Sequence, residues 1–292
     1  MAEQRRQEMV GEQADEMACR LRLSAPVDPL AVAATEAPLL RAGGRNFGNR
    51  FDGKLEYHRA TNRFLLFYNT KYDTEYPRGT HHPRTRFSIA HELGHYFIEH
   101  HRAYLLRGGK PHQSTVEFRS SVQIERQADA FAASLLLPTH LVRPIVNRGE
   151  LSTPRIESIA ADFQASLVST VIRCVSLSDF PCAVAGIRGG SVAWMFPSEA
   201  LIRVGCYPGG PELQSPAAHN QCEAFAQGRA SKTSAYGLVR HWFATYERDD
   251  LQDLYLTEQY IPVPVMDTLV VLLTLDESDV LSDEDVLSED DD

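Results

Sequence analysis

The stretch RTRFSIAHELGHYFI, residues 84–98, decides how this sequence is interpreted. Apolar residues recur at helical spacing across residues 86–100, so we predict a helix there. His91 and His95 are four positions apart and share one face of that helix, where both imidazoles can reach one cation. Glu92 lies about 100° around the helix from His91, since about 3.6 residues complete a turn. It therefore stands beside a bound metal, where a carboxylate can act as general base toward a water molecule.

A second predicted helix, residues 124–137, supplies further candidate ligands before Pro138 ends it. Glu125 and Asp129 are four residues apart and share one helix face. Because a catalytic zinc takes three protein ligands and keeps one open position, Glu125 can complete the set. Asp129 can accept a hydrogen bond from the second ring nitrogen of a bound histidine. The alternative is a solvated helix face on which these carboxylates pair with Arg126.

These two segments resemble the ImmA/IrrE family of metallo-endopeptidases. The resemblance rests on residues 84–98 and on IERQADAFAASLLLP at 124–138. FDGKLEYHRATNRFLLFYNT (51–70) and PVDPLAVA (26–33) agree with it. It covers about residues 1–145, roughly half of the chain.

The resemblance implies a role for each candidate residue. His91, His95 and Glu125 would bind zinc, and Glu92 would be the catalytic glutamate. Asp129 falls on a family position that is Asp or Asn, so its supporting role is carried over less directly. The cofactor is expected to be Zn²⁺, with Mn²⁺ possible because two imidazoles and one carboxylate accept either ion.

The resemblance also implies a protein substrate. Family members cleave or disable transcriptional repressors and antitoxin-like partners in bacteria and their mobile elements, often in response to stress. The strand predicted at residues 63–69 is the expected place for a substrate strand to add. We therefore expect a zinc-dependent endopeptidase that hydrolyses a peptide bond in such a regulator. The alternative is a metal-containing regulatory protein that acts by contact with a repressor or DNA. A purely structural zinc site is disfavoured, because three ligands leave a position open.

The predicted fold class is α+β, in four parts. Residues 1–146 form a zincin-like metallopeptidase domain, and residues 147–178 a helical segment that resembles a helix-turn-helix. Residues 179–275 form a small α/β accessory domain, and residues 276–292 an acidic disordered tail. The helix-turn-helix-like segment offers few groups for reading DNA bases, so we expect it to pack against the protein.

Local patterns predict the individual elements. Helices are expected at 1–25, at 30–41, through 139–178 and near 234–246, and Thr85 is expected to cap the helix that follows it. Hairpins are expected from 55–59 with 63–69, and from 182–187 with 191–196 around two glycines. Gly43, Gly44 and Gly48 indicate a loop, and residues 265–275 a buried strand.

The composition limits the binding partners and the cellular compartment that we expect. The formal net charge is -10, but residues 276–292 carry ten carboxylates and no Lys or Arg, so the rest of the chain is neutral. A neutral body with an acidic tail does not exclude direct nucleic-acid binding. Basic and imidazole side chains crowd residues 78–112, which could steer an acidic partner, bind the tail, or form a solvated loop. Five widely spaced cysteines, no signal-like start and no long apolar stretch predict a cytoplasmic protein with no membrane partner.

Overall fold

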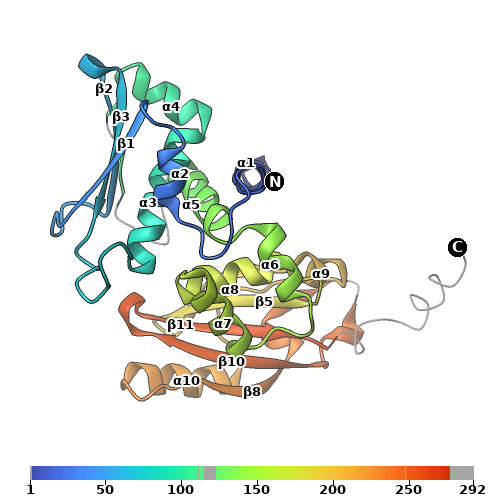
Figure 1. Ribbon diagram of the computed structural model, residues 1–292. Coiled ribbons are helices and arrows are strands. Elements are labelled where there is room, and N and C mark those ends of the chain that lie inside the picture. The colour runs from blue at the N-terminus through green and yellow to red at the C-terminus, as the bar shows by residue number, and fades with distance from the viewer. Residues whose placement is uncertain (1, 111, 115–122, 247, 277–292) are drawn as a thin grey trace, which may run out of the picture. The chain divides into compact units, whose positions relative to one another are not determined.

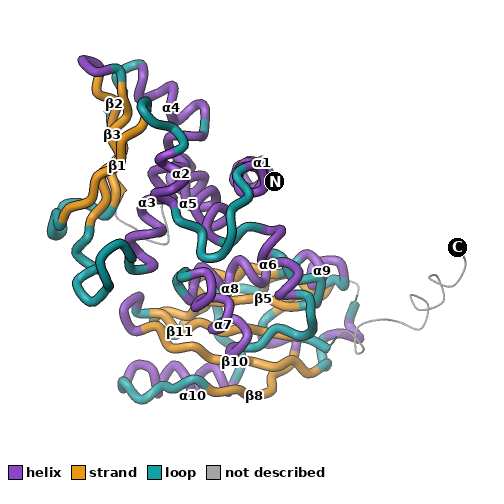
Figure 2. Tube along the Cα trace, in the orientation of Figure 1, coloured by secondary structure: helices purple, strands orange, loops and turns teal. Residues whose placement is uncertain are grey.

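The computed structural model describes residues 2–110, 112–114, 123–246 and 248–276 (Figures 1 and 2). Helices and strands are mixed along the chain, as the predicted α+β class requires. The chain divides into two compact units. The first unit comprises residues 1–141 and 159–169, and the second comprises residues 142–158 and 170–292. The predicted division into four parts stays a prediction, as does the tail, of which residues 277–292 lie outside the described residues.

The first unit contains a four-stranded sheet in the order β1-β3-β2-β4. Its strands are β1 (Leu40–Arg45), β2 (Gly53–His58), β3 (Arg63–Asn69) and β4 (His112–Ser114). β1 is parallel to β3, and β2 is antiparallel to both β3 and β4. The predicted hairpin is therefore present. Its turn contains Asn62 in a left-handed conformation, which Asn adopts more readily than most residues.

Two expectations for this sheet were wrong. Residues 30–41 are not one helix, because α2 (Pro29–Ala34) ends early and the chain enters β1. Gly43 and Gly44, expected in a loop, lie within that strand. A Cβ at Gly44 would come within 2.3 Å of the Tyr68 ring on β3. The glycine therefore allows close packing of an aromatic ring rather than a turn.

The prediction that a substrate strand would add to residues 63–69 was also wrong. β3 lies between β1 and β2, and both of its edges are used by backbone pairing. Only an edge strand presents unpaired backbone groups to an incoming chain. Within the described residues, the edges of this sheet are β1 and β4.

Helices pack beside this sheet and place the site (Figure 1). They are α1 (Ala2–Arg20), α2, α3 (Pro83–Phe97), α4 (Glu99–Leu106) and α5 (Gln123–Leu136). α3 packs against β2 and β3, α5 packs against α3, and α1 packs against α5. Apolar side chains from these elements form one buried core, which includes Leu66, Leu93 and Phe131.

The helix predicted over residues 86–100 is interrupted. α3 begins at Pro83, and its cap is His82 rather than Thr85. The His82 Nδ1 atom accepts a hydrogen bond from the Arg84 backbone N–H at 3.0 Å. At Ile98 the backbone turns to an extended conformation, and α4 starts one residue later.

Residues 139–178 are helical, as predicted, and form α6 (Thr139–Val146), α7 (Thr153–Phe163) and α8 (Leu167–Ser176). The boundary between the two units runs through them. α7 buries Ile156 and Phe163, and α8 buries Val171 and Val175. These buried faces agree with a packing role for the helix-turn-helix-like segment.

The second unit is built on a five-stranded antiparallel sheet in the order β6-β5-β11-β10-β8. The strands are β5 (Cys182–Arg188), β6 (Ser191–Pro197), β8 (Thr233–Leu238), β10 (Tyr255–Val263) and β11 (Thr268–Thr274). The remaining elements are α9 (Glu199–Arg203), α10 (Pro216–Ala226) and the pair β7 (Cys206–Pro208) and β9 (Phe243–Thr245). The second hairpin and the final strand were predicted, and α10 was missed.

The helix expected near 234–246 was wrong, because a buried carboxylate organises this region as strand and turn. Glu258 on β10 accepts hydrogen bonds from Ser215 at 2.9 Å, from Trp242 Nε1 at 2.7 Å and from the Tyr260 hydroxyl. Gly237 on β8 lies directly against it, since a Cβ there would come within 1.9 Å of Glu258 Oε1. These long-range contacts outweigh local helix propensity.

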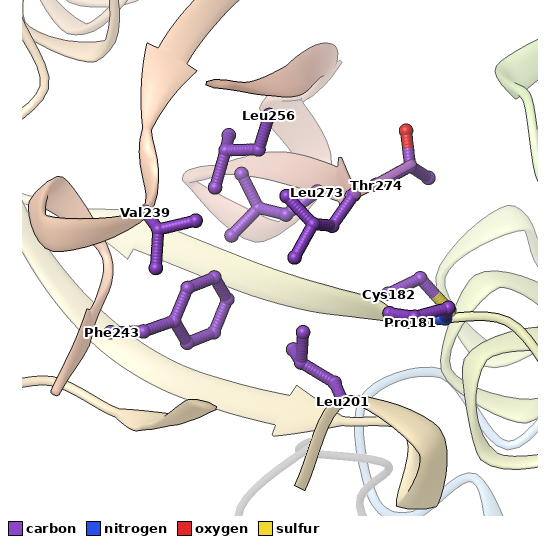
Figure 3. Close-up of a pocket in the computed structure, with 9 residues that line it drawn as sticks. Pro181, Cys182, Leu201, Val239, Phe243, Leu256, Leu273 and Thr274 are labelled. Atoms are coloured by element: carbon purple, nitrogen blue, oxygen red, sulfur yellow. The ribbon is translucent and has the colours of Figure 1, made fainter. Parts of the chain in front are cut away.

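Apart from the residues around Glu258, the core of the second unit is mostly apolar. A small pocket there is lined by Pro181, Cys182, Leu201, Val239, Phe243, Leu256, Leu273, Thr274 and Leu275 (Figure 3). Its walls carry almost no polar groups, so it offers nothing to orient a polar ligand. Across the residues that the structure describes, no helix has both the length and the apolar character to cross a membrane.

Candidate metal centre

Three side chains converge where α3 meets α5. The Nε2 atoms of His91 and His95 are 3.1 Å apart. Glu125 Oε2 lies 3.1 Å from His91 Nε2, and Glu125 Oε1 lies 3.6 Å from His95 Nε2. One ligand atom from each residue lies within 4.8 Å of the others. The structure thus brings together the three residues that the sequence singled out.

These spacings fit a single metal ion. Ligands at about 2.0–2.1 Å from a tetrahedral zinc are separated from one another by about 3.3 Å. The observed separations of 3.1 and 3.6 Å bracket that value. Both histidines are buried, whereas the Glu125 side chain remains 23% exposed, so the centre has an open side. The donor set suits zinc and also manganese.

Asp129 contacts the Nδ1 atom of His91, the ring nitrogen that does not face the other ligands. Its Oδ1 atom lies 2.8 Å from His91 Nδ1. When Nδ1 donates this hydrogen bond, the lone pair of Nε2 points into the centre. Burial lowers the pKa of His91, but hydrogen bonds to Asp129 and Glu125 outweigh it and raise the pKa to about 10. The surroundings of this ring therefore strongly favour positive charge.

The second histidine has a support that the sequence did not reveal. His95 Nδ1 lies 3.0 Å from His101 Nδ1, and His101 Nε2 lies 3.0 Å from Gln127 Oε1. On a continuous helix, residues six apart point to different sides, about 240° around the axis. The break at Ile98 returns His101 toward His95, and helical periodicity cannot show this.

Gly94 sets the spacing between the two helices that carry the centre. A Cβ at this position would lie 3.1 Å from the Ala128 Cα atom and 3.2 Å from the Ala128 carbonyl oxygen. These are backbone atoms of α5, so they cannot rotate away. The glycine inside the His-Glu-x-x-His motif therefore lets α5 approach α3 closely enough for Glu125 to reach both imidazoles.

Glu92 lies on α3 next to His91 and is fully buried. Its charge contributes to the raised pKa of His91. The carboxylate thus acts electrostatically on the centre.

Hydrolysis of a peptide bond would also use a donor that stabilises an oxyanion, and the candidates by residue type are Tyr96, Tyr104, His112, His219 and His241. No described contact brings one of them to the centre. Tyr96 donates its hydroxyl to Glu36 at 2.9 Å, and its pKa is raised to about 12 by burial and by that carboxylate. His219 and His241 belong to the second unit. Tyr104 packs at the end of α4, where its hydroxyl accepts a hydrogen bond from the Lys110 backbone N–H at 3.3 Å. The side chain of His112 lies outside the described residues.

Several members of the basic stretch 78–112 have structural partners instead of forming a free surface. Arg84 pairs with Asp52 at 2.8 Å, and His81 pairs with Asp73 at 2.7 Å. Arg86 is buried and donates to the Val27 carbonyl oxygen. The stretch is therefore less available to an acidic partner than its sequence suggested.

The fold and this site together define a mixed α+β protein with a candidate metal centre on a His-Glu-x-x-His helix and the helix packed against it. Residues 76–175 match the model of a peptidase family described as the IrrE N-terminal-like domain. The match confirms the resemblance to the ImmA/IrrE family over residues 76–175.

Among solved structures, the chain is similar to a Mycobacterium tuberculosis transcriptional regulator, with a TM-score of 0.54 and 12% identity. The alignment covers 93% of this chain and 77% of the other. At this identity the likeness concerns the fold alone. Comparison with curated proteins gave no match.

Proposed function

We propose that this protein is a zinc-dependent endopeptidase with a zincin-like catalytic domain. The observation that carries the proposal is the convergence of His91, His95 and Glu125 at the spacing of one tetrahedral ion. A structural zinc would be closed by a fourth protein ligand, whereas this set of three leaves a position for water or substrate.

Each residue has a distinct role in the proposed reaction. His91, His95 and Glu125 would hold the ion, which supplies Lewis acidity toward a water molecule and the substrate carbonyl. Glu92 takes the proton of the attacking water and returns it to the departing amine. Asp129 keeps the His91 ring in the tautomer that directs Nε2 into the centre. The burial of Glu92 keeps bulk water away from the carboxylate and strengthens its electrostatic effect.

The proposed substrate is a bacterial transcriptional repressor or an antitoxin-like regulator. The match to a peptidase family supports a protein substrate, and the fold shared with a transcriptional regulator is compatible with a regulatory setting. Because β3 is interior, a substrate that adds as a strand would use β1 or β4.

Substitution of the general base tests catalysis. Wild type and Glu92→Gln are each incubated with repressor-type proteins encoded near the gene, and mass spectrometry maps any products. We expect a discrete cut by wild type and at least a hundredfold slower cleavage by Glu92→Gln, since the amide cannot accept the proton. Glu99→Gln, an exposed change on α4, serves as control and should cleave like wild type. Equal cleavage by Glu92→Gln would exclude the proposed role of this glutamate.

A second function is supported by the fold alone. The structural alignment with the transcriptional regulator covers 93% of this chain, so it extends into the second unit. In this alternative the metal-containing protein acts by contact with a repressor or DNA, without proteolysis. Full biological activity of the Glu92→Gln variant would favour it over the peptidase.

A further inference from the structure

We propose that His101 and Gln127 are a positioning pair that fixes the tautomer and orientation of His95 as a metal ligand. The inference rests on the metal-binding part of the proposed function, but not on proteolysis. Neither residue belongs to the set of three side chains that could hold the ion. Each would act through the next side chain in a buried line from Gln127 to His101 to His95.

The direction of these hydrogen bonds follows from metal binding. If His95 Nε2 gives its lone pair to the ion, the ring proton must be on Nδ1. His95 Nδ1 then donates to His101 Nδ1 across 3.0 Å, so His101 carries its own proton on Nε2. That proton points to Gln127 Oε1, also at 3.0 Å. Each donor in the line meets one acceptor.

The opposite direction is incompatible with the ion. If the Gln127 amide were reversed, its NH₂ group would donate to His101, and the proton of His101 would lie on Nδ1. His95 would then have to accept at Nδ1 and carry its proton on Nε2, where the ion should bind. The amide orientation of Gln127 thus selects the tautomer of His95 through the intervening side chain of His101.

Burial makes this selection effective. His95 and His101 are completely buried, and Gln127 is 3% exposed, so bulk water does not compete for these hydrogen bonds. An unsatisfied buried donor or acceptor is costly, so the wrong tautomer would be penalised at each step. This line of side chains contains no carboxylate, in contrast to the contact of Asp129 with His91.

His100 provides a control for the loss of an imidazole partner of Gln127, although it is exposed and His101 is buried. The His100 Nε2 atom also lies 3.0 Å from Gln127 Oε1, but its described contacts do not include His95. His100 and His101 are adjacent in α4 and share a partner. Only His101 lies on the path to the centre.

The test compares metal binding in wild type, His101→Leu, Gln127→Met and His100→Leu. Affinity for Zn²⁺ is measured by competition with a chelator, and ligand geometry is followed by the visible spectrum of the Co²⁺-substituted protein. We expect His101→Leu and Gln127→Met to weaken Zn²⁺ binding by about ten- to a hundredfold and to change the Co²⁺ spectrum. His100→Leu should stay within about twofold of wild type. Gln127→Glu, which keeps the acceptor, should restore binding.

The outcomes separate this inference from the proposed function. Wild-type affinity and an unchanged Co²⁺ spectrum in both His101→Leu and Gln127→Met would overturn the positioning role. An equal loss in His100→Leu, or no rescue by Gln127→Glu, would also overturn it, because the effect would then be general packing. Should His101→Leu fail to fold, Gln127→Met and Gln127→Glu still decide. A wild-type protein that binds Zn²⁺ but cuts no substrate would leave the inference intact and remove the endopeptidase.

Discussion

At the residue scale, the two histidines of the centre are supported in different ways. Asp129 places a carboxylate 2.8 Å from His91 Nδ1, whereas His95 Nδ1 faces the imidazole of His101 at 3.0 Å. A carboxylate behind an imidazole makes it a stronger ligand. We therefore expect the carboxylate to strengthen His91 as a metal ligand.

Asp129→Asn tests the carboxylate behind His91. The amide oxygen can still accept the Nδ1 proton, but the negative charge is lost, so we expect Zn²⁺ affinity to fall by about tenfold. Asp129→Ala removes the acceptor as well and should weaken binding further, by up to about a hundredfold. Chelator competition gives both values. An affinity for Asp129→Ala equal to that of wild type would show that this contact does not support the ligand.

Part of this centre could be predicted from the sequence. His91 with His95, and Glu125 with Asp129, are each four residues apart on one helix, and helical geometry alone places them on shared faces. His101 and Gln127 have no such relation to His95. Their positions depend on the break at Ile98 and on the packing of α5, which are tertiary features.

At the element scale, the approach of α5 to α3 depends on Gly94. Gly94→Ala would place a methyl group 3.1 Å from a backbone atom of Ala128 and push the helices apart. Overpacking of this kind costs about 1–3 kcal/mol, partly offset by about 1 kcal/mol of helix propensity. We expect a net loss of unfolding free energy and weaker Zn²⁺ binding, as Glu125 moves from the imidazoles. Denaturant unfolding and chelator competition measure the two effects.

Gly11→Ala is the control for this change. Gly11 lies on α1, which also packs against α5, but its added Cβ would meet the Ser134 hydroxyl at 3.0 Å. A side-chain hydroxyl can rotate away, so this variant should be neutral or more stable by up to about 1 kcal/mol. If both alanine variants bind Zn²⁺ like wild type, close helix approach at Gly94 is not needed by the centre.

The cap of α3 should respond to acid. Burial lowers the pKa of His82 below its ordinary 6.5, and its neutral Nδ1 accepts the first-turn N–H of Arg84. The unfolded chain therefore takes up a proton at His82 more readily than the folded protein does. Stability from this group is present above pH 6.5 and is lost as the pH falls below that value.

His82→Asn provides the comparison, because asparagine also caps helices but does not titrate. Relative to this variant, the metal-free wild type should lose up to about 1 kcal/mol of unfolding free energy between about pH 7 and 5. Denaturant unfolding followed by circular dichroism measures the difference. A constant difference between the two proteins at both pH values would contradict the proposed cap titration.

Several elements were foreseeable and others were not. The β2–β3 hairpin, α5 and β11 follow local patterns of alternation or periodicity. β1 and β8 do not, because Gly44 and Gly237 are placed by contacts with Tyr68 and Glu258 from other strands. Tertiary packing decided those segments against their local propensities.

At the scale of the whole molecule, the metal centre and the tryptophans are in different units. The ligands belong to the first unit, while Trp194 and Trp242 belong to the second. The two hydrophobic cores share no residue. Tryptophan fluorescence therefore reports on the second core, and circular dichroism reports on both.

Removal of the metal should accordingly affect one transition. A ligand at a thousandfold excess over its dissociation constant stabilises the folded state by about 4 kcal/mol. Addition of a chelator should lower the midpoint temperature of a melting transition followed by circular dichroism. The midpoint temperature of the transition followed by tryptophan fluorescence should not change. A parallel shift of both signals would show that the two cores unfold together.

The most direct test of the central claim is the metal content of purified protein, measured for wild type, Glu92→Gln and Glu125→Ala after dialysis against Zn²⁺. We predict about one equivalent in wild type and in Glu92→Gln, because Glu92 stands beside the ion and does not hold it. Glu125→Ala should retain much less, since only two of the three ligands remain. A wild type without bound metal, or a Glu125→Ala variant that keeps a full equivalent, would contradict the metal centre proposed for His91, His95 and Glu125.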